Sequence, residues 1–108
     1  MTVETFANST ECKILCMPSP EREIDGAYIG DLLSWVMGKA QSGNVWITIM
    51  SNLNVVAVAT LADVSAILLC EGVLLDSDVL ALAESRGVNV LSTELSAYDA
   101  ARTVSGVI

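Results

Sequence analysis

The most constraining feature of this chain is a nearly uncharged block between Lys39 and Glu71. Its sequence is AQSGNVWITIMSNLNVVAVATLADVSAILLC, and Asp63 is its only charged residue. A membrane-spanning helix needs about 20 successive, mostly apolar residues. Here hydroxyl and amide side chains interrupt the run, and Asp63 would lie deep in lipid at a cost of roughly 2.5 to 3.5 kcal/mol. We therefore interpret the block as a strand, a helix and a strand of a buried parallel sheet.

The elements expected around this block alternate between strands and helices. Strands are predicted at residues 12–17, 45–50, 66–70 and 88–91, and helices at residues 31–41, 53–64, 76–86 and from Ser92 or Thr93 to 105. Such alternation is typical of a single α/β domain with a mostly parallel sheet of about four strands and helices on both faces. We place this domain at residues 11–108 and expect residues 1–10 to be a polar N-terminal tail.

Apolar spacing also predicts which helix residues face inward. The expected inward residues are Ile29, Leu33, Val36 and Ala40 for the first helix, Val79, Leu82 and Ala83 for the third, and Leu95, Tyr98 and Ala101 for the last. For the second helix, a hairpin strand at residues 55–60 is the competing interpretation, because valine is a weak helix former. A helix is favoured by four residues that share one face: Leu53, Val56, Ala57 and Thr60. This helix would be apolar on both sides, so one side would meet the sheet and the other a partner subunit.

Composition and charge narrow the possible partners. Hydrophobic residues make up 53% of the chain and charged residues 17%, which is more apolar surface than one small core needs and favours a homodimer. The net charge is −8, and the five basic residues are scattered, which disfavours binding to nucleic acid or to an anionic membrane surface. Residues 1–10 lack the pattern of a signal peptide, and three cysteines without one fit a reducing compartment, so we expect a cytoplasmic protein.

Four stretches carry a resemblance to a known family: YIGDLLSWVM, WITIM, ADVSAILLCEG and LDSDVLALAESRGVNVLSTELSAYDAA. Together, between Tyr28 and Ala101, they resemble a DRTGG domain. That family occurs as a small stand-alone protein and as a module of CBS-domain pyrophosphatases, and it is similar to the N-terminal domain of bacterial HPr kinase. The resemblance implies an α/β domain that dimerises and has a regulatory rather than a catalytic role.

The chain departs from the family's namesake motif at two strand ends. Where the family has an Ile-Thr-Gly-Asp-Arg segment, this chain has Ile-Thr-Ile-Met-Ser at residues 47–51. Where the family has Thr-Gly-Gly, this chain has Cys70, Glu71 and Gly72. Only Thr48 and Gly72 retain the family's polar positions, so the ligand contacts of the other motif residues do not carry over.

Polar residues follow the ends of three predicted strands, where open α/β sheets bind ligands. The candidate ligand-binding residues are Thr48, Ser51, Asn52, Asn54, Glu71, Gly72, Ser92, Thr93 and Glu94. The acidic field and the lack of a nearby Lys or Arg favour a neutral polar ligand over a nucleotide. The alternative interpretation is that these residues are helix caps and turn formers.

The three cysteines suggest a second chemistry. Cys12 and Cys16 are expected on one face of a strand, and Cys70 at the end of another. If these strands were neighbours, Cys16 and Cys70 could meet in a redox or soft-metal site. Structural zinc usually has four Cys or His ligands, whereas this chain has three Cys and no His, so buried, inert thiols are the simpler interpretation and no metal is predicted.

No catalytic constellation is recognisable. Without histidine, Ser-His and Cys-His pairs are impossible, and no GxxxxGK[ST] or GxGxxG loop is present. We therefore expect no catalysis and no cofactor. The leading hypothesis is a non-catalytic regulatory or ligand-sensing module acting as a homodimer, with a small molecule or a partner protein as its ligand. The alternative is an accessory protein of redox or metalloenzyme metabolism that uses Cys12, Cys16 and Cys70.

Overall fold

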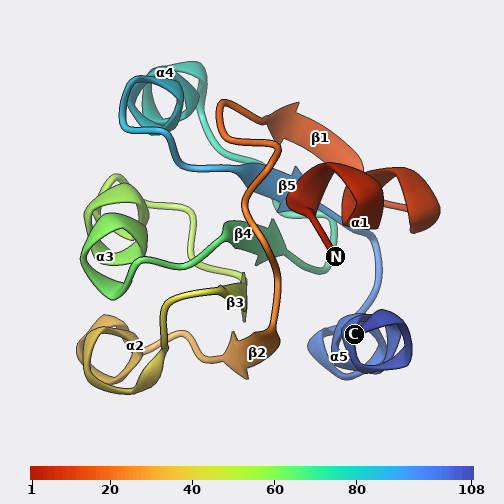
Figure 1. Cartoon of the computed structure of the whole chain (residues 1–108). Helices are drawn as coiled ribbons and strands as arrows, with labels where there is room; N and C mark the ends of the chain where they lie inside the picture. The colour runs from red at the N-terminus through yellow and green to blue at the C-terminus, as the bar shows by residue number, and fades with distance from the viewer.

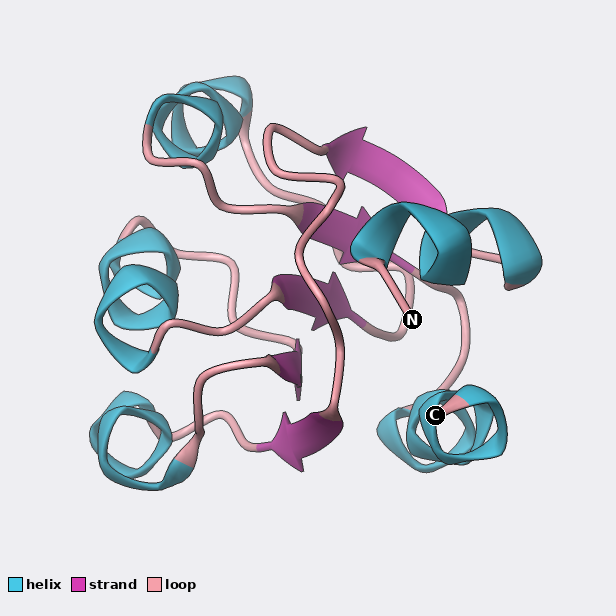
Figure 2. Cartoon of the chain, in the orientation of Figure 1, coloured by secondary structure: helices cyan, strands magenta, loops and turns pink.

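The centre of the molecule is a five-stranded sheet with the strand order β1-β5-β4-β3-β2. A computed structural model describes residues 1–108. The strands are β1 (Lys13–Cys16), β2 (Gly26–Ile29), β3 (Asn44–Thr48), β4 (Ala66–Leu69) and β5 (Val90–Ser92). Strands β2 to β5 are parallel. Strand β1 pairs antiparallel with β5 (Figure 2). The predicted α/β class with a mostly parallel sheet is therefore confirmed, with five strands rather than about four.

Five helices cover the two faces of the sheet. They are α1 (Val3–Ser9), α2 (Leu33–Lys39), α3 (Asn54–Ala62), α4 (Ser77–Ser85) and α5 (Ala97–Val107). Helices α2, α3 and α4 lie side by side on one face, and α1 and α5 lie on the other (Figure 1). Because each of the connections from β2 to β5 places its helix on the same face, the crossovers share a single hand, as βαβ units do.

Strand β2, at the edge of the sheet beside β3, was not predicted. Strand β2 contains Gly26, and Ala27 and Ile29 are exposed, so it lacks the continuous apolar run that marks a central strand. Its insertion before α2 means that β1 is not followed directly by a helix. Strand β1 instead runs antiparallel at the opposite edge of the sheet, where Lys13 pairs with Ser92.

The central strands are buried on both faces, which explains the nearly uncharged block. All four residues of β4 are buried. Trp46 and Ile67 point towards α2, α3 and α4, and Ile47 and Leu68 point towards α1 and α5. Two apolar cores thus lie on either side of the sheet, and alternate residues of each strand serve one or the other.

The first ten residues differ from the expected tail. Residues Val3–Ser9 form helix α1, and Thr2 caps it by accepting a hydrogen bond from the Thr5 N–H. Val3, Phe6 and Ala7 are buried in the core that α1 and α5 form with one face of the sheet. The segment has three apolar residues at helical spacing, and this short stripe is sufficient because the sheet supplies the surface that it covers.

Residues 54–62 form a helix and not a hairpin strand, and the four residues expected to share one face do not share the same burial. Of these four residues, Val56 is buried, whereas Leu53, Ala57 and Thr60 are exposed. The sheet and the neighbouring helices instead bury a different set: Val55, Val56, Val58, Ala59 and Ala62.

Helix α2 begins two residues later than predicted. Asp31 therefore lies before the helix and not in its first turn. Its carboxylate accepts hydrogen bonds from the Thr48 hydroxyl and the Ile49 N–H. Of the predicted inward residues Val36 is fully buried, Leu33 and Ala40 are partly buried, and Ile29 is exposed.

The last helix also begins later than predicted. Ser96, and not Ser92 or Thr93, is its N-cap and accepts a hydrogen bond from the Asp99 N–H. The buried residues of this helix are Ala100 and Val104. Of the three residues predicted to face inward, Leu95 and Tyr98 are exposed and Ala101 is partly buried. With 11 residues α5 is the longest helix, and none of the helices combines the length and the apolar character needed to cross a bilayer.

Candidate functional site

The loops after β4 and β5 meet at the carboxyl edge of the sheet. The Gly72 N–H donates to the Thr93 carbonyl at 2.9 Å, and the Glu71 N–H donates to the Leu95 carbonyl at 2.8 Å. Gly72 has a φ of 73°, and a Cβ there would lie 2.7 Å from Glu94 Oε2. Glycine is therefore favoured at position 72 by the left-handed backbone conformation, whereas the exposed Glu94 side chain could move away from a Cβ.

A polar pocket of about 160 Å³ lies where these loops meet, and we call it the strand-end pocket. Four of the nine predicted ligand residues line it: Gly72, Ser92, Thr93 and Glu94. Ser92 and Thr93 are buried, whereas Glu94 is exposed. The Ser92 hydroxyl donates to the Val73 carbonyl at 2.8 Å, so it holds the loop in place as well as lining the pocket.

Lys13 and Glu11 also line the strand-end pocket. No basic residue was expected near the predicted site, and the position of Lys13 corrects this expectation. Lys13 reaches the pocket because β1 pairs with β5 and sets Lys13 opposite Ser92. The pocket therefore combines two carboxylates, Glu11 and Glu94, with one ammonium group.

The other five candidates do not line this pocket. Thr48 is buried and donates to Asp31, and the Asn52 Oδ1 accepts from the Asn54 N–H at 2.9 Å at the start of α3. Ser51 is exposed, and Glu71 occupies a turn with a φ of 59°. For Thr48 and Asn52 the contacts are those of the alternative interpretation, in which these residues shape turns and helix starts.

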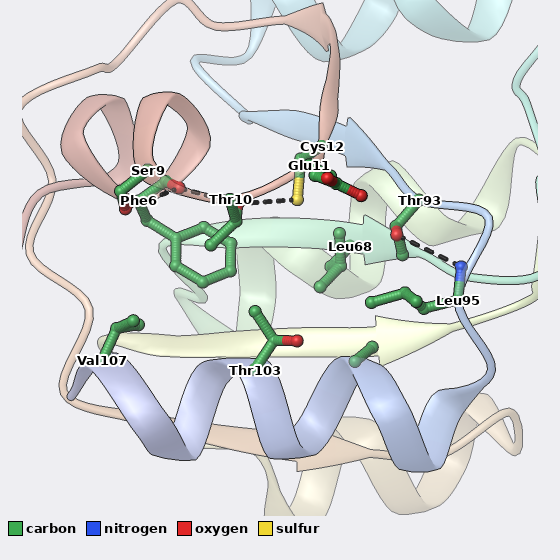
Figure 3. A pocket seen from close by; sticks show the side chains of 11 residues that line it. Phe6, Ser9, Thr10, Glu11, Cys12, Leu68, Thr93, Leu95, Thr103 and Val107 are labelled. Carbon is green, nitrogen blue, oxygen red and sulfur yellow. Dashed lines mark hydrogen bonds between the residues drawn. The ribbon is translucent and has the colours of Figure 1, made fainter.

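A second, larger cavity of about 290 Å³ lies between α1, α5 and the sheet, and we call it the interhelix cavity (Figure 3). Phe6, Leu68, Leu95, Ala100 and Val107 provide its apolar walls. Glu11 and Thr93 line both this cavity and the strand-end pocket, so the two hollows adjoin each other. The interhelix cavity was not predicted from the sequence, because one of its walls is α1, a segment that was expected to be a tail.

The cysteines do not form a pair. Cys16 packs in the core beneath α2, α3 and α4, whereas Cys12 and Cys70 pack in the core beneath α1 and α5. A register irregularity between Ile14 and Cys16 breaks the alternation of β1, which explains why Cys12 and Cys16 do not share a face as predicted. Strand β5 also separates β1 from β4, so Cys16 and Cys70 are not on neighbouring strands.

The environment of each thiol makes it a poor nucleophile. Burial raises the pKa of the Cys12, Cys16 and Cys70 thiols above the ordinary value, and a thiol reacts as its thiolate. No group of three or more His, Cys, Asp or Glu side chains is arranged to hold a metal ion. The geometry therefore gives no support to the redox or metal alternative.

The fold and the site together define a mostly parallel α/β domain with a polar pocket at the carboxyl ends of its strands. The chain belongs to the DRTGG domain family, whose model matches residues 6–107. The family suggested by the sequence is thus confirmed, and the match includes most of α1. No curated protein matches the chain at a significant level.

Among solved structures, the chain is similar to the CBS and DRTGG domains of the regulatory region of Clostridium perfringens pyrophosphatase, complexed with the activator diadenosine tetraphosphate. The TM-score is 0.74 at 12% sequence identity, and the match covers 95% of this chain and 45% of that one. At this identity the similarity concerns the fold. The chain spans less than half of the regulatory region that it matches.

Proposed function

We propose that this chain is a non-catalytic regulatory module that binds a small polar molecule in the strand-end pocket. The observation that carries the proposal is the convergence of Gly72, Ser92, Thr93 and Glu94 with Lys13 around one pocket. Membership of a family that also occurs in the regulatory region of a pyrophosphatase supports a regulatory role. No cluster of nucleophile, base and oxyanion donors accompanies the pocket, which is consistent with binding without chemistry.

The charges of the pocket indicate the kind of ligand. Glu11, Glu94 and Lys13 are the charged residues that line the pocket, and the whole chain has a net charge of −8. A polyphosphate such as the activator of the pyrophosphatase would be repelled by this field. We therefore expect a polar ligand without net negative charge.

A thermal-shift screen of metabolites tests the proposal. We expect a compound that raises the melting temperature of the wild-type protein and loses most of that effect in Lys13→Met and in Glu94→Gln. Both side chains are exposed, so both variants should fold normally. Asn52→Ala is the matched control, since Asn52 is exposed at the same edge but does not line the pocket, and it should keep the shift. Loss of the shift in Asn52→Ala alone would place the ligand at the end of β3 instead.

We further propose that the module acts as a homodimer through the outer side of α3. Leu53, Ala57 and Leu61 are spaced four residues apart and all are exposed, with Leu61 at 73%. Trp35 on the adjacent α2 is also exposed. An unpartnered apolar stripe of this kind on a helix is typical of a subunit contact.

Charge substitution on this stripe should produce a monomer. We expect Leu61→Glu to halve the mass measured by light scattering in solution while leaving the melting temperature of the monomeric fold nearly unchanged, because the side chain is mostly exposed. Leu74→Glu, also at an exposed leucine but outside α3, is the control and should remain dimeric. A wild-type protein that is monomeric at high concentration would contradict the dimer.

A further inference from the structure

The proposed ligand site in the strand-end pocket does not account for the interhelix cavity. Its walls are apolar on the side of the sheet, where Leu68 forms the floor, and on the side of α1, where Phe6 is fully buried (Figure 3). It holds about 290 Å³ and therefore has room for an apolar group larger than a methyl or an isopropyl. Ligand sites are commonly of this kind, mostly apolar with a few polar groups that fix orientation.

Three of the four hydroxyl groups around the cavity already use their hydrogens within the chain. The Ser9 and Thr10 hydroxyls donate to the Phe6 carbonyl at 3.3 and 2.8 Å, and the Thr103 hydroxyl donates to the Asp99 carbonyl at 3.0 Å. A hydroxyl has one hydrogen and two lone pairs, so these three groups offer mainly lone pairs to the cavity. They can accept hydrogen bonds from a ligand but cannot donate without breaking an existing bond.

The charge at the junction of the cavity and the strand-end pocket also favours a ligand that donates hydrogen bonds. Glu11 lines both the cavity and the strand-end pocket, and a carboxylate is an acceptor only. Thr93 lies at the same junction, accepts a hydrogen bond from the Leu95 N–H, and donates none within the chain. The junction thus presents a negative charge and several acceptors, and Thr93 is the one lining hydroxyl with a free hydrogen.

We infer that the interhelix cavity binds the apolar body of an amine-bearing ligand, with its N–H groups directed at Glu11 and its remaining polar part directed past Thr93 into the strand-end pocket. The inference rests on the proposed function and specifies the class of ligand. An apolar body matches Phe6 and Leu68, and an ammonium group supplies donors to a lining that consists mainly of acceptors. A carboxylate or phosphate in place of the amine would face Glu11 and the lone pairs of the hydroxyls.

Three probes with the same ring and different head groups test this class: benzylamine, benzyl alcohol and benzoate, each titrated into ¹⁵N-labelled protein. We expect benzylamine to shift the amide signals of Thr93, Leu95 and Thr103 with a dissociation constant of about millimolar, as suits a ligand of this size. Benzyl alcohol should bind more weakly, and benzoate should cause no shift at these residues. Benzoate binding as tightly as benzylamine would overturn the charge preference.

Two variants locate the probe. Thr103→Phe should fill the cavity and abolish the benzylamine shifts, whereas Thr60→Phe should keep them. Thr60 is the matched control because its hydroxyl, like that of Thr103, donates to a carbonyl of its own helix, and that helix lies on the other face of the sheet. Glu11→Gln should weaken benzylamine about two- to fivefold, as expected for an exposed charge, whereas Glu84→Gln on α4 should not. Unchanged binding in Thr103→Phe would show that benzylamine does not bind in the interhelix cavity.

The two proposals can fail separately. If a compound found by thermal shift depends on Lys13 and Glu94 but is unaffected by Thr103→Phe, the strand-end pocket is correct and the inference about the cavity is wrong. If benzylamine depends on Thr103 and Glu11 while no compound depends on Lys13 or Glu94, the cavity is a binding site and the strand-end pocket is not.

Discussion

Phe6→Ala should lower the free energy of unfolding by about 3–5 kcal/mol, the usual cost of truncating a fully buried phenylalanine. Phe6 has no exposed surface and is one of the largest side chains in the core beneath α1 and α5. Its removal leaves α1 attached mainly by Val3 and Ala7. For a domain whose total stability is about 5–15 kcal/mol, this is a large fraction.

Urea unfolding followed by circular dichroism measures the effect as a lower midpoint. Asn8→Ala is the control, because Asn8 is exposed on the same helix and should change stability by no more than about 0.5 kcal/mol. Phe6→Leu, which keeps most of the apolar volume, should lie between the two. An unchanged midpoint in Phe6→Ala would mean that residues 1–10 behave as the tail expected from the sequence and not as a helix of the core.

The same substitution connects stability to binding. Phe6 is one wall of the interhelix cavity, so enlarging the cavity at this point should also weaken benzylamine binding, whereas Asn8→Ala should not. The cavity exists only because α1 is packed on the sheet. Residues that were expected to form a polar N-terminal tail therefore carry both part of the core and part of the candidate site.

The sequence predicted best those elements whose residues are buried on all sides. Strand β4 and its surroundings form a continuous apolar run, and a run of that kind between turn residues has few alternatives. Strand β2 was missed because an edge strand is half exposed and its alternation is weak. The start of α5 was misplaced because Ser92 and Ser96 are equally good caps in sequence, and only the pairing of β5 with β4 decides between them.

The candidate site was predicted in part for a related reason. That Gly72, Ser92, Thr93 and Glu94 would meet followed from the general rule that parallel strands end at one edge. The presence of Lys13 did not follow, because it depends on the antiparallel pairing of β1 with β5, between residues 79 positions apart in the chain. Contacts between distant segments of this kind leave no periodic pattern in the sequence.

Asn89 is a second feature without a signal in the sequence, and Asn89→Leu should destabilise the protein by about 2–4 kcal/mol. Asn89 is 1% exposed and directly precedes β5. Its Oδ1 accepts from the Ser19 N–H at 2.9 Å, and its Nδ2 donates to the carbonyls of Ser19 at 2.7 Å and of Ser65 at 2.9 Å. One amide thus joins the connector between β1 and β2 to the start of β4, and each of these hydrogen bonds contributes about 0.5–1.5 kcal/mol.

Leucine has a similar volume, so the loss should come from the three unmade hydrogen bonds rather than from a cavity. Asn89→Asp should be less stable still at neutral pH, because it keeps the acceptor for Ser19 N–H but places a buried negative charge against two carbonyl oxygens. Asn54→Leu is the control at an exposed asparagine and should be nearly neutral. Urea midpoints for the three variants, with hydrogen exchange at Ser19, provide the measurement. If Asn89→Leu matches the wild type in both, the amide does not hold the connector, and the polar contacts at this end of the sheet contribute little to the fold.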